Sequence, residues 1–141
     1  MSVDSKDGER RVRRASCSCG GLTATCTGKP VRVSVCHCLA CQRRSGSAFA
    51  AQVRFASEDV AVAGESRSFV RRGDSGGAAT FRFCPRCGTT VVFVADATPE
   101  LSAIPLGVFE TRDFPLPEYS VYEERKLPWV RIEGEGIEHL D

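Results

Sequence analysis

The chain has 141 residues and a formal net charge of +1, and no apolar run in it is long enough to span a bilayer. This length fits one domain with a core of its own. The near-neutral charge argues against binding to nucleic acid or to an anionic membrane. Residues 1–14 are polar and charged, with no apolar segment of the kind that opens a signal peptide. We therefore expect a flexible tail at 1–14, a domain over 15–141 and a cytoplasmic location.

Short alternating segments separated by glycine and proline predict a mainly β fold in one domain. One short helix is expected at residues 38–44, ended by Gly46. Phe49, Phe55 and Phe69 are expected in the core. The predicted strands, in chain order, lie at residues 21–26, 31–36, 48–55, 60–63, 68–72, 79–83, 89–95, 101–109, 120–122 and 129–132.

Eight cysteines are the unusual feature of the composition. An even number can indicate disulfides, but these residues come in tight Cys-x-Cys and Cys-x-x-Cys pairs, which suit a shared metal ion better. A reducing compartment would also keep them as thiols. The sequence therefore predicts zinc ligands among Cys17, Cys19, Cys26, Cys36, Cys38, Cys41, Cys84 and Cys87.

The pair Cys84 and Cys87 lies between two predicted strands, in the sequence Cys-Pro-Arg-Cys-Gly. A tight turn there directs both sulfurs at one ion, forming a zinc-knuckle hairpin that supplies half of a tetrahedral site. Cys17 and Cys19 can supply the other half, because residues i and i+2 of an extended segment face the same way. We expect these four cysteines to form a closed, structural zinc site.

Cys36, Cys38 and Cys41 place three thiols within six residues. Three protein ligands and an open fourth position are typical of catalytic zinc sites. A second structural zinc is the alternative, with Cys26 or His37 as the fourth ligand. His37 lies between two ligands and should point away from them, whereas Cys26 is expected to be a buried thiol.

These motifs resemble the glutathione-dependent formaldehyde-activating enzyme family, whose domain is shared with centromere protein V. The similar segments are Cys17 to Gly21, Thr27 to Pro30, Cys36 to Ser47, Phe83 to Thr89 and, more weakly, Pro117 to Trp129. The resemblance implies a tent-like β fold and two zinc ions per chain. It assigns Cys17, Cys19, Cys84 and Cys87 to the structural ion and Cys36, Cys38 and Cys41 to the catalytic ion. Members often carry a histidine where this chain has Ser120.

Three thiolates make zinc a weaker Lewis acid than three imidazoles do, so capture of a soft thiol suits the site better than activation of water. We expect glutathione to bind there through sulfur and to add to formaldehyde or another small aldehyde, a carbon–sulfur lyase-type reaction. Arg43, Arg44 and Ser45 are candidate substrate-binding residues. The alternative is a non-catalytic zinc-stabilised module that binds a protein partner. The sequence indicates no oligomeric state.

Overall fold

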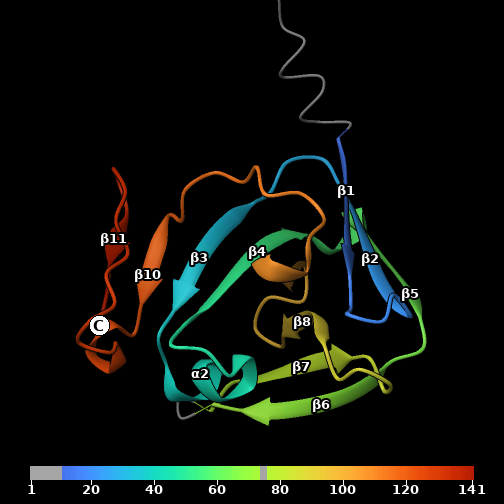
Figure 1. Ribbon diagram of the computed structural model, residues 1–141, viewed down its shortest axis with the longest axis horizontal. Helices are drawn as coiled ribbons and strands as arrows, with labels where there is room; N and C mark the ends of the chain where they lie inside the picture. Colours follow the sequence, from blue (N-terminus) through green and yellow to red (C-terminus); the bar gives the residue numbers. More distant parts are fainter. Residues whose placement is uncertain (1–10, 74–75) are drawn as a thin grey trace, which may run out of the picture.

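The computed structural model describes residues 11–73 and 76–141 and contains two β-sheets (Figure 1). One has three strands in the order β1-β2-β5, and the other has eight in the order β11-β10-β3-β4-β9-β8-β7-β6. The strands are β1 (Val12–Ser16), β2 (Leu22–Thr27), β3 (Arg32–Cys36), β4 (Ala50–Ala56), β5 (Val60–Gly64), β6 (Arg67–Arg72), β7 (Ala78–Phe83), β8 (Thr90–Ala95), β9 (Leu101–Pro105), β10 (Tyr119–Val121) and β11 (Glu138–His139).

One α-helix occurs in the part of the chain that the structure describes, α2 (Leu39–Ser45), together with the 3-10 turns η1 (Ser57–Asp59), η2 (Leu106–Val108) and η3 (Glu123–Arg125). The helix ends at Gly46, whose φ of 66° is the left-handed conformation that glycine adopts without strain. The predicted mainly β class with one short helix is confirmed.

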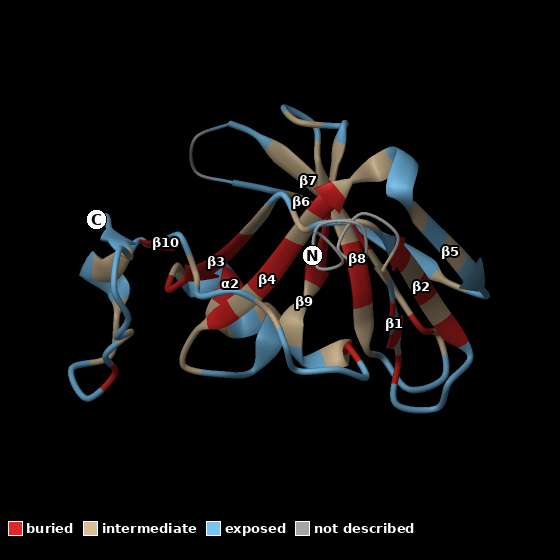
Figure 2. Cartoon of the chain, turned by 90° about the horizontal axis from the view of Figure 1, so that it is seen from above, coloured by how far each residue is buried: buried red, intermediate tan, exposed pale blue. Residues whose placement is uncertain are grey.

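The core lies between the two sheets, where buried residues from β1, β2, β3, β4, β8 and β9 meet (Figure 2). Alternation on β3 and β4 gives this large sheet two distinct faces. Val33 pairs with Val53, and Val53 pairs with Ile104, so these three buried side chains share the core face. Their neighbours, among them Ser34 and Gln52, point to the opposite face.

The opposite face of the large sheet carries a continuous row of cross-strand partners. The register joins Phe69 to Phe81, Phe81 to Phe93, Phe93 to Ala103, Ala103 to Arg54 and Arg54 to Arg32. Antiparallel partners lie on the same side of a sheet. One face of six adjacent strands therefore runs from aromatic side chains on β6 to β8 to arginines on β4 and β3.

Several expectations of the sequence need correction. The strand expected at 101–109 ends at Pro105, where η2 follows, and Phe49 is only partly buried, outside both buried clusters. Residues 129–132 form no strand: the amide of Val130 donates to the carbonyl of Leu127 in a turn, and Trp129 is 75% exposed. Phe69 is 61% exposed on the edge strand β6 and is not part of the core. Two strands, β1 and β11, were not expected.

The expected boundary between residues 14 and 15 falls inside β1, which pairs along its length with β2. Most of the expected tail, residues 1–10, lies outside the described residues. Within the described residues, 11–73 and 76–141, no helix is both long and apolar enough to cross a membrane.

Candidate metal centres and substrate site

Cys17, Cys19, Cys84 and Cys87 come together with their four sulfurs within 4.8 Å of one another. Cys17 and Cys19 follow β1, and the other two lie on the turn between β7 and β8. The Sγ of Cys19 is 3.7 Å from that of Cys17 and 3.6 Å from that of Cys84. Four converging thiols are a complete donor set for a tetrahedral zinc ion.

Backbone amides point at the sulfurs of this four-cysteine cluster. The amide of Leu22 donates to the Sγ of Cys17 at 3.2 Å, and the amide of Arg86 donates to the Sγ of Cys84 at 3.4 Å. Such donors stabilise thiolates over thiols. Around Cys87, hydrogen bonds from the hydroxyl and the amide of Thr89 lower the thiol pKa to about 5.

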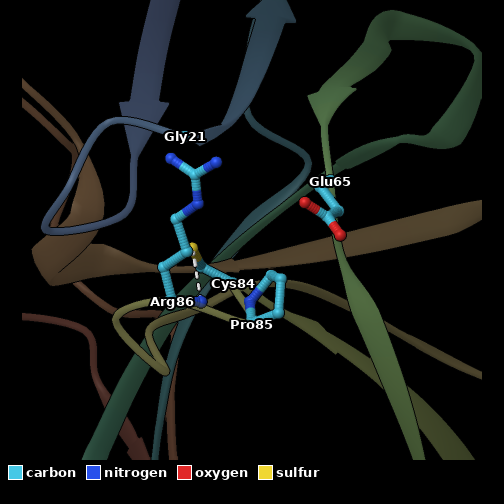
Figure 3. Close-up of a pocket in the computed structure, with 5 residues that line it drawn as sticks. All are labelled: Gly21, Glu65, Cys84, Pro85 and Arg86. Atoms are coloured by element: carbon cyan, nitrogen blue, oxygen red, sulfur yellow. Dashed lines mark hydrogen bonds between the residues drawn. The ribbon is translucent and has the colours of Figure 1, made fainter.

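A hollow of ≈ 190 Å³ lies beside this cluster, lined by Gly21, Glu65, Cys84, Pro85 and Arg86. Figure 3 shows Arg86 and Glu65 on opposite sides of it, and the hydrogen bond from the amide of Arg86 to Cys84. The four sulfurs already form a complete ligand set. A substrate thiol would therefore find a free ligand position only at the other cysteine cluster, if each cluster holds one tetrahedral ion.

Cys36, Cys38 and Cys41 also converge, with sulfurs within 4.8 Å of one another. Cys36 ends β3, Cys38 is the N-cap of α2, and Cys41 lies in the first turn of that helix. The amide of Cys41 donates to the Sγ of Cys38 at 3.3 Å. Strand, cap and helix turn thus direct three thiols at one point, as their spacing predicts.

No fourth His, Cys, Asp or Glu from residues 11–73 and 76–141 joins this three-cysteine cluster. Cys26 is fully buried in the core between the sheets, where burial raises the pKa of its thiol to about 12. His37 is also fully buried, and its Nε2 is hydrogen-bonded to the Oγ of Ser120 at 2.9 Å. Neither residue therefore joins the three sulfurs, although the Nδ1 of His37 is buried without a hydrogen-bond partner among the described residues.

Near Ser120, the Oε2 of Glu123 is hydrogen-bonded to the Nδ1 of His139 at 2.7 Å. Although burial raises it, the pKa of Glu123 is held below its usual range by hydrogen bonds from His139 and Ser120. Burial lowers the pKa of His37, so its neutral form is favoured.

Gln42 connects α2 to the neighbouring segments by hydrogen bonds. Its Nε2 donates to the carbonyl of His37 at 2.7 Å and to the carbonyl of Arg125 in η3 at 3.1 Å. The amide of His37 in turn donates to the carbonyl of Val121 in β10. These bonds hold the loop that carries Cys36 and Cys38 between the sheet and the C-terminal segment.

Polar side chains of β3 and β4 lie on the same face of the sheet as Cys36. The Oγ of Ser34 accepts from Gln52 Nε2 at 2.9 Å and from Arg54 Nη1 at 3.0 Å. The Oε1 of Gln52 is buried, without a hydrogen-bond partner among the described residues. Burial lowers the pKa of Arg54, and the Cys36 and Cys41 thiolates act in the opposite direction.

The positive charges near the cluster favour thiolates. Hydrogen bonds from Cys36 and Cys38 and the charges of Arg71 and Arg44 lower the pKa of Cys41 to about 5, against the effect of burial. In the metal-free protein, hydrogen bonding with Cys41, together with burial, raises the pKa of Cys36. Cys41 therefore gives up its proton more readily than Cys36 does.

The three expected substrate-binding residues have different surroundings. Arg43 is exposed, whereas Arg44 is half-buried over the rings of Phe81 and Phe93, with its guanidinium carbon 5.5 and 5.1 Å from their centroids. The hydroxyl of Ser45 donates to the carbonyl of Cys41 at 2.8 Å. Arg44 thus lies beside a buried aromatic surface, and Ser45 is engaged within its own helix.

Four polar residues of the site were not found from the sequence: Ser34, Gln52, Arg54 and Arg71. Ser34 lies two residues before Cys36, so strand alternation alone could have placed it on the same face. Gln52, Arg54 and Arg71 come from β4 and β6, and only the strand register brings them there. No local pattern marks them.

The donor chemistry of both clusters fits zinc. Thiolates are soft ligands that zinc prefers, and sulfurs this close repel one another as thiolates unless a cation lies between them. The fold and these two clusters define a small, mainly β protein with two thiol-rich sites that could hold metal ions. A family model for the glutathione-dependent formaldehyde-activating enzyme matches residues 12–125. The chain belongs to this family.

A solved structure of a Rhodobacter sphaeroides protein is similar to this chain, with a TM-score of 0.55 and 18% sequence identity. The similarity covers 71% of this chain and 90% of that one, and at this identity it indicates a shared fold. No curated protein gives a significant match.

Proposed function

We propose that this protein is a zinc-dependent carbon–sulfur lyase-type enzyme that joins glutathione, or a similar small thiol, to formaldehyde or another small aldehyde. The observation that carries the proposal is the three-cysteine cluster with no fourth protein ligand in the described chain. Membership of a family named for glutathione-dependent formaldehyde activation supports the choice of substrates.

In this proposal the two clusters have different roles. Cys36, Cys38 and Cys41 hold a catalytic zinc, and Cys17, Cys19, Cys84 and Cys87 hold a structural one. The bound catalytic zinc would supply a position for the thiol sulfur and favour its thiolate form. A reducing compartment such as the cytoplasm suits both sites, because their ligands must stay unoxidised.

The chain's own residues hold the three cysteines in place for the thiol. Gln42 and His37 fix the loop that carries the cysteines, so the three sulfurs are held in place before a substrate arrives. Burial of Cys36 and Cys41 leaves the partly exposed side of the cluster, near Cys38, for the substrate. Arg44 provides positive charge beside this position.

The reaction is a reversible addition. The thiolate sulfur forms a bond to the carbonyl carbon, the π electrons of the C=O bond move to oxygen, and the proton released by the thiol ends on that oxygen. The product is an S-hydroxymethyl adduct, with no net oxidation or reduction.

Calorimetry of glutathione binding to the zinc-loaded protein tests the proposal. A free thiol with a pKa of about 8.5 is mostly protonated at pH 7, so binding as thiolate should release about one proton. The apparent binding enthalpy should then differ between two buffers of different ionisation enthalpy. Absence of binding at millimolar glutathione would reject the thiol substrate and favour a binding module for a protein partner.

A further inference from the structure

Two arginines from distant parts of the chain share one aromatic platform beside the three-cysteine cluster. Arg44 comes from α2 and Arg71 from the edge strand β6, and both guanidinium groups lie over the ring of Phe81. The carbon of the Arg71 guanidinium is 4.8 Å from the centroid of that ring. Phe81 stacks on Phe93 with centroids 4.8 Å apart, which extends the platform under Arg44.

Neither guanidinium pairs with a carboxylate among residues 11–73 and 76–141, where the ion pairs are Arg11 with Asp113 and His139 with Glu123. Nε and Nη2 of Arg44 and Nη1 of Arg71 are buried and find no hydrogen-bond partner in that part of the chain. Buried donors without acceptors are costly. The charge of Arg71 also lowers the pKa of Arg44, after the larger effect of burial. The fold thus holds two like charges together without supplying an acid.

The thiolates next to the pair do not balance all of the positive charge. Cys36 and Cys41 interact electrostatically with Arg44 and Arg54, and Cys41 also with Arg71. A zinc ion with the three protein thiolates and one substrate thiolate would have a net charge of −2, against three positive charges from Arg44, Arg54 and Arg71. Arg32, the partner of Arg54 on β3, adds a further positive charge. The site thus keeps a net positive charge, which a carboxylate on the substrate would reduce.

We propose that Arg44 and Arg71 form a carboxylate-binding site that selects thiols carrying a carboxylate, with Arg71 as a specificity-determining residue. This inference rests on the proposed function and names its substrate class. Planar guanidinium forks match the two oxygens of a carboxylate, and stacking on Phe81 and Phe93 holds the forks in place beforehand. Both residues are only partly buried, so part of each side chain faces solvent.

The test compares glutathione with two derivatives in which one carboxylate, that of the glycine or that of the γ-glutamyl residue, is a primary amide. Affinities for the zinc-loaded protein are measured by calorimetry. One of the two amides should bind about 10- to 100-fold more weakly than glutathione, the usual effect of losing a charged hydrogen bond. Equal binding of all three thiols would overturn the proposal.

Variants then assign the effect to the arginines. In R44Q and R71Q the preference for glutathione over the weaker amide should disappear, whereas R72Q, which changes the exposed neighbour on β6, should keep it. If R44Q and R71Q weaken the binding of all three thiols equally, the arginines act only on the cysteine cluster and the proposal is wrong. R71K, which retains the charge without the fork, replaces R71Q if that variant does not fold, and it should lose at least half of the preference in free energy.

Cobalt substitution separates this inference from the proposed function. Coordination of a fourth thiolate changes the absorption of a cobalt–thiolate site, so glutathione should alter the spectrum of the cobalt-loaded protein. An unchanged spectrum would reject thiol coordination, while the comparison of acid and amide would still decide whether the arginines bind a carboxylate.

Discussion

The Nε2 of His37 and the Oγ of Ser120 are hydrogen-bonded at 2.9 Å, and both side chains are fully buried. This bond ties the three-cysteine segment to β10, which lies parallel to β3 and pairs Ser120 with Val35. Ser120 occupies the position at which the family resemblance led us to expect a histidine. In this protein the residue is a partner of the histidine between two of the cysteines.

Replacing Ser120 with alanine should destabilise the protein by about 1–3 kcal/mol, because it leaves a buried imidazole nitrogen without a partner. The metal content should stay the same, since Ser120 is not a ligand. Denaturant unfolding of the zinc-loaded protein gives the first quantity and elemental analysis the second. Ser68→Ala, on the exposed edge strand, is the matched control. An unchanged free energy of unfolding for Ser120→Ala would show that the bond does not support the loop.

Cys84→Ser and Cys38→Ser should have different effects. The unmodified protein should hold close to two zinc ions. Cys84→Ser removes a ligand from the closed cluster that joins β1 to the β7–β8 turn, so it should unfold or aggregate. Cys38→Ser should yield a folded protein with one zinc ion. Thermal unfolding measures the stability of each variant, and elemental analysis measures its zinc content. Equal melting temperatures of the two variants would refute the division into structural and catalytic sites.

Cys26 should make stability depend on pH in the alkaline range. Burial raises its pKa to about 12, so the folded state keeps the proton that the unfolded state releases above a pKa of about 9. Its contribution is complete below pH 9 and is lost as the pH rises from there toward 12. Cys26→Ala should reduce this decline by up to about 1.4 kcal/mol per pH unit, as measured by denaturant unfolding at pH 8 and 10. A decline of the same steepness in the variant would mean that Cys26 is not the titrating group.

Gly64 allows β5 to pair closely with the segment that follows the first cysteines. Its φ is 103°, and a Cβ there would overlap the carbonyl oxygen of Gly21. Gly64→Ala should therefore cost at least about 2 kcal/mol in free energy of unfolding. Gly107→Ala adds a Cβ that meets nothing within 4 Å, at a residue without positive φ, and should be nearly neutral. Similar losses in the two variants would contradict this account of the close approach.

Both cysteine clusters could be predicted from the sequence because their geometry is local. Cys36, Cys38 and Cys41 converge through one strand end and one helix turn, and Cys84 and Cys87 through one hairpin turn. Only the pairing of the first two cysteines with that hairpin is long-range, and tetrahedral zinc needs four ligands. Burial of Cys26 also followed from its apolar strand.

Other features depend on register and tertiary packing. β1 contains two arginines and reads as a charged tail, yet Arg13 is buried with its guanidinium 4.8 Å from the centroid of Phe114. Phe69 is a large apolar residue of the kind that usually lies in a core, but β6 is the edge strand of the sheet and leaves it exposed. Arg71 reaches the site only through the order of β6, β7 and β8. Residues 129–132 alternate like a strand but follow Pro128 into a turn.

The most direct test of the central claim is exchange NMR of the glutathione–formaldehyde adduct with the zinc-loaded protein. The three-cysteine site is expected to bind the thiol and pass it reversibly to the aldehyde. Exchange between free glutathione and the S-hydroxymethyl adduct should therefore be faster with the unmodified protein than with buffer or with Cys38→Ser. The decisive comparison is made at concentrations where calorimetry shows that glutathione is bound. If the exchange rate with the unmodified protein then equals the rate in buffer, the account is contradicted.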